Sequence, residues 1–316
     1  MTSPSPDTVR AALLLTNRLV TLAAEPLTAR EFWHLVERVD VAQLVHSTPA
    51  EISELAGVDG DEAARLRTLL DATTAFAFEQ DRLADGGVEL VSALDDRFPT
   101  VLCVRLGAAC PPFLFLAGPI EWLGRQALGV IGSRDADEAA LDVARRSAQL
   151  AAEHGWQVVS GLARGVDQAA MAAALDAGGA VVGVPAEGIG RVARAAAVRS
   201  RVHAGELCLA SPYVPDAPFR ATNAMGRNKI IYALSSVAFA AAAEEGRGGT
   251  WSGAKEALDR RYAPVAVWTG PGATDGNRAL ARRGAIGVSD PAELFELDLT
   301  VEPTPPRSPP PQPSLF

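Results

Sequence analysis

From residue 128 onward, short apolar runs alternate with helical stretches, and this alternation constrains the fold more than any other feature of the chain. The strand-like runs are ALGVIGS, WQVVSG, GAVVGVP, SVAFAAAA, APVAVWTG and GAIGVS. Helical stretches such as DEAALDVARRSAQLAAEHG and VDQAAMAAALDAG lie next to them. Strands buried in a parallel sheet are continuously apolar, as these runs are. The pattern predicts an α/β fold with a doubly wound, mostly parallel sheet.

The N-terminal part of the chain predicts a small all-helical domain. Residues 8–80 carry apolar side chains at helical spacing, and Thr28 with Glu31 matches a capping box. The stretch ELAGVDGDEAARL is similar to a degenerate helix-hairpin-helix, and a plain helical packing module explains it as well. We therefore expect a helical domain of the SAM or helix-hairpin-helix kind (1–82), a connector with short strands (83–127), the sheet domain (128–300) and a disordered Pro-rich tail (301–316).

Charge and cysteine content narrow the classes of function. The net charge of −9 means that any contact with nucleic acid must use a local basic groove. The three cysteines, Cys103, Cys110 and Cys208, have no metal-ligand spacing, so we expect no metal and a role in core packing. We see no signal-peptide pattern and no apolar run of membrane-spanning length, so we expect a cytoplasmic protein with no membrane contact.

Two strand ends carry glycines together with an arginine. Gly132, Ser133 and Arg134 follow one strand, and the next strand is followed by a similar corner. Glycine lets a ligand approach the backbone, the helix that follows offers free N–H groups, and a guanidinium can hold phosphate with two hydrogen bonds. Two such corners favour a phosphate site over two ordinary tight turns. The residues of the second corner are Ser160, Gly161, Arg164, Gly165 and Asp167.

Two later segments extend the predicted phosphate site. In NAMGRNKIIYALSS we expect Arg227, Asn228 and Lys229 near the start of a helix, where cations oppose the helix dipole unless they face an anion. Solvated charges on an amphipathic helix are the alternative. In GRGGTWSG we expect Gly249 and Thr250 to open another helix with free amides. Trp251 is a candidate for base stacking or for core packing.

Several enzyme and cofactor classes are not supported by the sequence. GRGGTWSG is not a P-loop, because the spacing to Lys255 is wrong and no Ser or Thr follows it. The first strand of the sheet domain is not followed by GxGxxG, so we expect no dinucleotide cofactor. We expect no catalytic residues.

Taken in order, these motifs resemble the DprA/Smf family of DNA-processing proteins. The resemblance is carried by GVIGSR, WQVVSGLARGVDQAA, GRNKIIYALS and GNRALARRGA, with ALDDRFPTVL and PPFLFLAG upstream. It implies an extended Rossmann-like domain after a helical N-terminal module, and a homodimer that binds single-stranded DNA and passes it to the RecA recombinase during DNA uptake or recombination. Neither a cofactor nor catalysis is implied.

The chain departs from the family pattern at several positions. Met171 stands where the family usually has His, and the family's Tyr-Pro loop is replaced by PAEGIGRVARAAAVRSR. The arginines of that segment, Arg191, Arg194, Arg199 and Arg201, are candidates for widening a DNA groove. The segment MGRNK to GGTWSG also resembles lysine-decarboxylase-like nucleotide hydrolases. The alternative function is therefore a sensor of a nucleotide-derived ligand, or an N-glycosidase-like hydrolase, that uses the same pocket; Glu256 is the nearest acid.

The end of the chain resembles a short peptide that binds the bacterial replication sliding clamp. The residues QPSLF follow a Pro-rich stretch, which suits a tethered peptide. Gln312, Leu315 and Phe316 would make the contacts, and Pro313 departs from the usual leucine.

Overall fold

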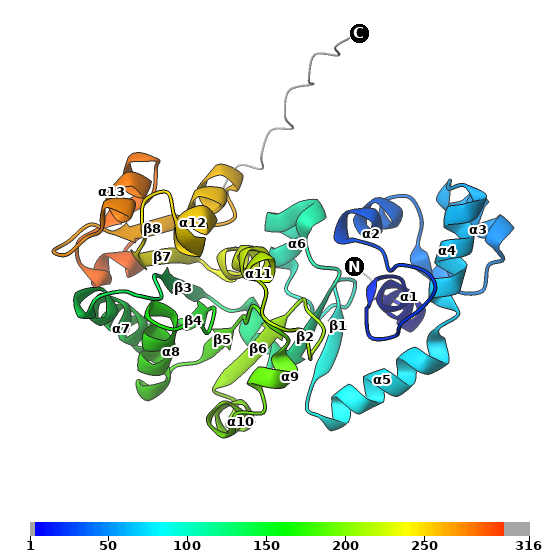
Figure 1. Cartoon of the computed structure of the whole chain (residues 1–316), viewed down its shortest axis with the longest axis horizontal. Coiled ribbons are helices and arrows are strands. Elements are labelled where there is room, and N and C mark those ends of the chain that lie inside the picture. The colour runs from blue at the N-terminus through cyan, green and yellow to red at the C-terminus, as the bar shows by residue number, and fades with distance from the viewer. Residues whose placement is uncertain (1–3, 300–316) are drawn as a thin grey trace, which may run out of the picture.

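The computed structural model describes residues 4–299 and contains a helical N-terminal part beside a large sheet (Figure 1). The Pro-rich tail and the clamp-peptide residues predicted there lie outside the described residues. None of the described helices has the length and apolar character needed to cross a membrane.

The N-terminal part is helical, as the sequence predicts. Thr28 and Glu31 form the predicted capping box, since the Thr28 side chain accepts from the Glu31 amide and the Glu31 carboxylate accepts from the Thr28 amide. Gly57 ends one helix in the left-handed conformation, with φ at 63°. The elements are α1 (Pro6–Thr16), α2 (Ala29–Val36), η1 (Val41–Leu44), α3 (Pro49–Ala56), α4 (Gly60–Leu70) and α5 (Thr73–Asp85).

In the described part of the chain, nine strands form one sheet in the order β1-β2-β6-β5-β4-β3-β7-β8-β9. Within this order, every neighbouring pair from β6 through to β9 is parallel. The strand β2 pairs antiparallel with β6, with Phe115 opposite Ser211, and β1 pairs antiparallel with β2, so these two strands form an antiparallel edge. Their bounds are β1 (Glu89–Ser92), β2 (Phe113–Ala117), β3 (Ala127–Gly132), β4 (Gln157–Ser160), β5 (Val181–Gly183), β6 (Leu207–Ser211), β7 (Val237–Ala242), β8 (Val265–Trp268) and β9 (Ile286–Val288).

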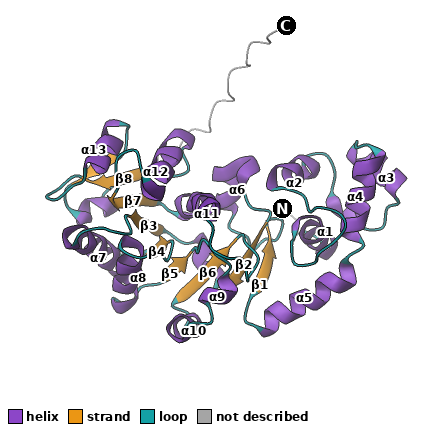
Figure 2. Ribbon diagram, viewed as in Figure 1, coloured by secondary structure: helices purple, strands orange, loops and turns teal. Residues whose placement is uncertain are grey.

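Helices cover both faces of the sheet, which confirms the doubly wound prediction (Figure 2). In β3, Leu128 and Val130 belong to the core cluster that contains α7 and α8, while Ile131 belongs to the cluster that contains α11 and α12. The elements of this part are α6 (Thr100–Leu106), η2 (Gly107–Ala109), η3 (Ile120–Gly124), α7 (Glu138–Glu153), α8 (Val166–Asp176), α9 (Ile189–Val192), α10 (Ala196–His203), α11 (Ala221–Leu234), α12 (Gly248–Arg260), α13 (Asp275–Arg282) and η4 (Pro291–Phe295).

The strand order reverses between β3 and β7. From β3 the chain builds outward through β4, β5 and β6, whereas β7, β8 and β9 are added on the other side. Parallel sheets of this kind bind ligands outside the carboxyl ends of their strands at such a reversal. The fold therefore predicts a ligand site beyond Gly132 and Ala242, where β3 and β7 end.

Candidate nucleic-acid interface

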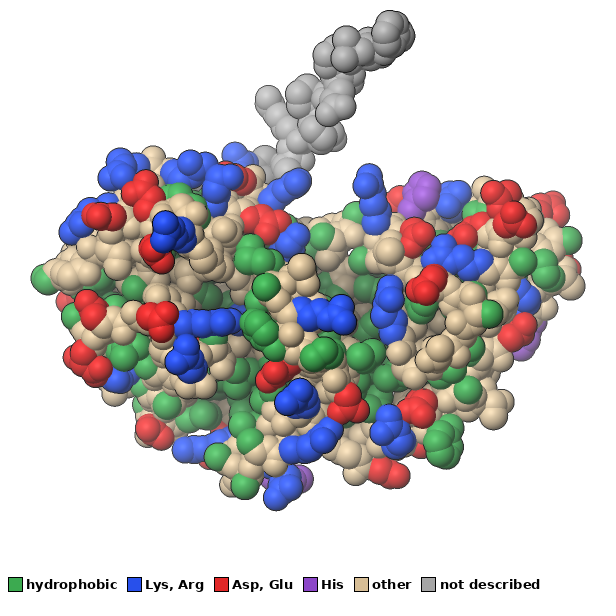
Figure 3. All heavy atoms as spheres, viewed as in Figure 1, with side chains coloured by type: hydrophobic (Ala, Val, Ile, Leu, Met, Phe, Trp, Pro, Cys, Tyr) green, Lys and Arg blue, Asp and Glu red, His purple; other side chains and the backbone are tan. Residues whose placement is uncertain are grey.

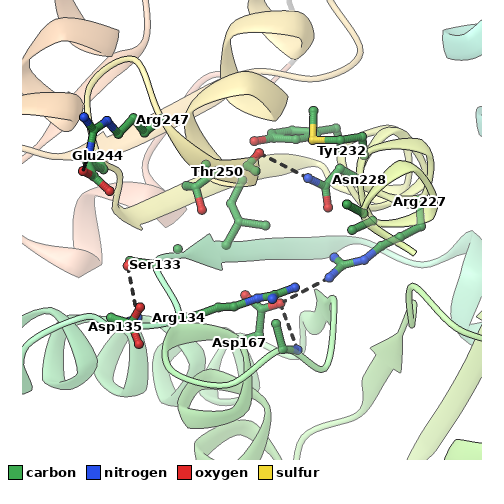
Figure 4. A pocket seen from close by; sticks show the side chains of 18 of the residues that line it. Ser133, Arg134, Asp135, Asp167, Arg227, Asn228, Tyr232, Glu244, Arg247 and Thr250 are labelled. Atoms are coloured by element: carbon green, nitrogen blue, oxygen red, sulfur yellow. Dashed lines mark hydrogen bonds and ion pairs between the residues drawn. The ribbon is translucent and has the colours of Figure 1, made fainter. Parts of the chain in front are cut away.

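A pocket of about 440 Å³ lies at this reversal point. It is bordered by the end of β3, the loop before α8, the α11 helix and the first residues of α12 (Figure 4). Of the residues that the sequence predicts for the phosphate site, the pocket brings together Gly132, Ser133, Arg134, Asp167, Arg227, Asn228, Gly249 and Thr250.

The corner after β3 is fixed by backbone contacts. The Ser133 amide donates to the Ala242 carbonyl at 2.9 Å, which ties the end of β3 to β7. The Ser133 hydroxyl accepts from the Asp135 amide at 3.1 Å and so closes a tight turn. Arg134 extends from this turn and is exposed to solvent. The corner therefore presents one guanidinium from a rigid base.

The glycines of the first two corners allow the two loops to touch. A Cβ atom on Gly132 would lie 2.5 Å from a methyl carbon of Val166, and one on Gly165 would lie 2.5 Å from the Ser133 carbonyl oxygen. Gly165 also has a φ of 79°, which favours glycine. Both glycines therefore serve the close packing of the two loops.

The second corner is occupied by the protein's own groups. The Ser160 hydroxyl is buried and donates to the Val130 carbonyl at 2.6 Å. The Asp167 carboxylate accepts from the Ala163 amide at 3.3 Å. An internal carboxylate therefore occupies the backbone amides of this corner.

Arg227 lies in the middle of α11, so the prediction that it stands near a helix start is wrong. The helix begins at Ala221, and the chain enters it through the extended residue Arg220. Arg227 is 5% exposed, and a Cβ atom on Gly161 would lie 1.7 Å from its Nη1 atom. The bare backbone at Gly161 therefore accommodates the guanidinium of Arg227. Because Arg227 is not at the N-terminus of α11, the helix dipole does not oppose its charge in the way that the sequence analysis assumed.

The Arg227 guanidinium is only partly compensated. Its Nη2 atom lies 3.8 Å from an Asp167 carboxylate oxygen, and its buried Nε atom has no hydrogen-bond partner among the described residues. Burial raises the pKa of Asp167 to about 6, although Arg227, the amides of Ala163 and Gly161, and Arg134 all lower it. Burial likewise lowers the pKa of Arg227, and Arg134 adds to that effect. In both groups the loss of solvation outweighs their mutual attraction.

The third wall of the pocket is the start of α12. The helix begins at Gly248, and its preceding residue Arg247 provides no side-chain cap. The Asn228 side-chain amide donates to the Gly249 carbonyl at 3.2 Å and so joins α11 to α12. Thr250 lines the pocket beside them. Uncapped amides at a helix N-terminus are suited to an anion.

Two predicted cations lie outside the pocket lining. The Arg164 side chain is 77% exposed, and its Nη2 atom is 3.9 Å from an Asp135 carboxylate oxygen. Lys229 faces away toward Glu256, with 3.0 Å between Nζ and a carboxylate oxygen. Arg164 therefore borders the rim of the site, whereas Lys229 is held by an ion pair on another side of α11.

The additional arginines of the segment 185–201 are not part of this pocket. Arg194 pairs with Asp216 at 2.6 Å, and Arg201 pairs with Glu206 at 2.7 Å. Arg199 lies on α10, which Figure 1 shows at the edge of the molecule away from α12. None of the arginines in this segment, Arg191 included, is among the residues that line the pocket with Arg134 and Arg227.

The structure adds two site residues that the sequence analysis missed, Phe219 and Arg247. Both line the pocket, and the Arg134 guanidinium lies 5.3 Å from the centroid of the Phe219 ring. Phe219 gave no signal in the sequence because it is a single aromatic residue in a loop. Trp251, the aromatic residue considered for stacking, packs against the core on α12.

Arginines and carboxylates are equal in number in the pocket lining, and Arg164 beside it adds one positive charge. The lining groups are Arg134, Arg227 and Arg247 with Asp135, Asp167 and Glu244. Three of the site's arginines have a nearby carboxylate, at 3.9 Å for Arg164, 3.8 Å for Arg227 and 3.8 Å for Arg247. Arg134 has no carboxylate within ion-pair distance among residues 4–299. Figure 3 shows Lys and Arg side chains crossing the middle of this face with hydrophobic side chains between them.

Comparison with known proteins identifies the family. The profile of the family described as DNA recombination-mediator protein A matches residues 89–297. Protein Smf of Escherichia coli is 32% identical over 194 residues, which are 59% of this chain and 50% of Smf. The DNA processing protein DprA of Bacillus subtilis is 27% identical over 193 residues, which are 59% of this chain and 64% of that protein. The matched region thus spans less than two thirds of either relative.

Solved structures agree on the fold. The X-ray structure of DNA processing protein A from Streptococcus pneumoniae covers 85% of this chain and 98% of its own, with a TM-score of 0.65 and 24% identity. DNA processing protein A from Helicobacter pylori, whose description states a single-stranded DNA binding mode, covers 66% and 94%, with a TM-score of 0.55 and 20% identity. Together with the family profile, which matches well over half of the residues, these findings confirm the resemblance seen in the sequence: the chain belongs to the DNA recombination-mediator protein A family, also called DprA/Smf.

Proposed function

We propose that this protein binds single-stranded DNA across the pocket between β3 and β7 and acts in DNA uptake or recombination. The observation that carries the proposal is the pair of guanidiniums, from Arg134 and Arg227, that face one buried carboxylate, Asp167. A phosphate of the strand would pair with the Arg134 guanidinium, which forms no ion pair with a described residue. It would also accept from donors that the protein leaves unused.

The surrounding ion pairs support this proposal because they are loose. Arg164, Arg227 and Arg247 lie 3.8–3.9 Å from their carboxylates, which is beyond hydrogen-bond distance. Each guanidinium therefore retains N–H donors that a phosphate oxygen can accept from without a tight pair first being broken. Charge-assisted hydrogen bonds of this kind are stronger than neutral ones.

The family supplies the biological part of the proposal. The family's description as a recombination mediator, and the single-stranded DNA binding stated for the Helicobacter pylori protein, support a role on single-stranded DNA in recombination. We further propose that the protein acts as a homodimer in the cytoplasm and delivers the strand to the RecA recombinase. Faster assembly of RecA on single-stranded DNA in the presence of this protein would support the delivery step. The clamp-binding peptide at 312–316 also stays a proposal, and its test is clamp pull-down before and after deletion of those residues.

DNA binding is tested by fluorescence anisotropy with labelled oligo-dT. Arg134→Ala is expected to weaken binding about tenfold, since one charge-assisted hydrogen bond is worth ~1.5 kcal/mol or more. Arg146→Ala is the matched control, because Arg146 is an exposed arginine of α7 that pairs with Glu153. The proposal fails if the wild type does not bind oligo-dT, or if the two variants bind equally well.

A second candidate is a free nucleotide ligand in the same pocket. A volume of about 440 Å³ lies within the range of small-molecule sites. Hydrolysis of such a ligand has less support, because Glu256 is paired with Lys229 and is not among the residues that line the pocket. Calorimetric titration with a panel of mononucleotides and with oligo-dT separates the two candidates, since a sensor would bind a mononucleotide and not the oligonucleotide.

A further inference from the structure

Phe219 is a large aromatic residue that the fold leaves exposed at the edge of the pocket. It is 49% exposed, and the residues on both sides of it, Pro218 and Arg220, are exposed as well. A single exposed apolar side chain is ordinary on a protein surface. Phe219 differs because it lines a pocket that also contains Arg134 and Arg227.

The loop that carries Phe219 is anchored on both sides of the residue. The Ala217 carbonyl accepts from the Gly188 amide at 2.9 Å. The Tyr213 hydroxyl donates to the Asn223 carbonyl at 2.8 Å, which ties the loop to the first turn of α11. Pro218 restricts the backbone directly before Phe219. The backbone on both sides of the ring is thus fixed before any ligand binds, which lowers the entropic cost of binding.

The surroundings of the ring suit a base next to a phosphate. The Arg134 guanidinium lies over the ring, 5.3 Å from its centroid, so a base would stack on the face that this cation does not cover. The small side chains of Ala221 and Ala224 line the same pocket and leave room beside the ring. A nucleotide likewise joins a flat base to a phosphate. An aromatic face accepts any base by stacking, independent of sequence.

We propose that Phe219 is the base-stacking platform of this site, on which one base of the DNA strand lies while the neighbouring phosphate contacts Arg134. The inference rests on the proposed single-stranded DNA binding and adds a base contact to it. It assigns to Phe219 the role considered for Trp251, whose ring packs against the core.

The substitution Phe219→Leu tests the stacking contact. Leucine keeps an apolar side chain at an exposed position, so the fold is expected to persist. The matched control is Phe78→Leu, since Phe78 is a 70% exposed phenylalanine on α5, in the N-terminal part. Phe219→Leu is expected to weaken oligo-dT binding about tenfold, and Phe78→Leu is expected to leave it unchanged.

Salt dependence distinguishes stacking from a phosphate contact. The slope of log affinity against log salt reports the number of phosphates neutralised. Phe219→Leu is therefore expected to lower the affinity at every salt concentration without changing the slope. Arg134→Ala is expected to reduce the steepness of the slope by about 0.7, the value for one phosphate on a single strand.

A strand without bases completes the test. On an abasic oligonucleotide with the same phosphates, wild type and Phe219→Leu are expected to bind equally, because no base can stack. The inference is wrong if Phe219→Leu binds oligo-dT as well as Phe78→Leu does, or if it weakens the abasic and the dT strands alike. Absence of wild-type binding to both strands would instead overturn the proposed function itself.

Discussion

The Nη2 atom of Arg227 lies 3.8 Å from a carboxylate oxygen of Asp167, and both side chains are almost fully buried. The pair joins the middle of α11 to the first turn of α8 beside the end of β4. Gly161 makes the contact possible, because any side chain there would overlap the guanidinium. The buried positive charge at the pocket wall is therefore fixed by residues 161–167 together with α11, some 60 positions later in the chain.

The first prediction concerns Gly161. In Gly161→Ala the new methyl group would meet Arg227 Nη1 at 1.7 Å, so the guanidinium must move. We expect the variant to lose about 1–3 kcal/mol of unfolding free energy, as overpacked cores do, and to bind oligo-dT less well. Gly60→Ala is the control, since nothing lies within 4 Å of a Cβ atom there. Denaturant unfolding checks both, and equal stability of the two variants would contradict the packing role of Gly161.

The second prediction concerns pH. The pKa of Asp167 is raised from 3.8 to about 6, so the folded state binds its proton more tightly than the unfolded state does. The contribution of Asp167 to the free energy of unfolding is therefore greatest at low pH, and it falls as the pH rises through about 4 to 6. The charged groups that act on Asp167 are the guanidiniums of Arg227 and Arg134.

Thermal unfolding of wild type and Asp167→Asn measures this effect. Lowering the pH from about 7.5 to about 5 is expected to shift the stability difference in favour of the wild type, because the variant has no proton to gain. A difference that does not change with pH, or one that shifts the other way, would show that attraction to Arg227 outweighs burial.

The third prediction concerns the thiols of Cys103 and Cys110, whose Sγ atoms lie 2.8 Å apart. Mild oxidation with diamide is expected to join them in a disulfide, with the two hydrogens passing to the reagent. Cys208 is buried and is expected to keep its thiol. Thiol titration and peptide mass analysis check this, with Cys110→Ser as the control. Persistence of all three thiols in oxidised wild type would contradict the expectation.

Elements governed by local patterns could be predicted from the sequence. The strands that end at Gly132 and Ser160 are continuously apolar, and the Thr28–Glu31 capping box depends on residues three positions apart. The two glycine corners were found because glycine and arginine types follow each strand. These features need no knowledge of distant contacts.

Features that depend on distant contacts could not be predicted. The start of α11 was missed because ATNAMG has Asn and Gly, which are weak helix formers; in the structure Gly226 leaves room for Tyr213, since a Cβ atom would lie 2.6 Å from its hydroxyl. That Gly161 would receive a side chain from α11, and that Lys229 would turn to Glu256, depends on how the elements pack. The role of Phe219 as a site residue likewise depends on the packing of its loop beside Arg134.

The salt dependence of oligo-dT binding, measured for wild type and Arg134→Ala, tests the central claim most directly. With three or four arginines contacting phosphates, the wild-type slope of log affinity against log salt is expected to be about −2 to −3, and the variant's slope about 0.7 less steep. Wild-type binding that does not depend on salt, or a slope that Arg134→Ala leaves unchanged, would contradict the account.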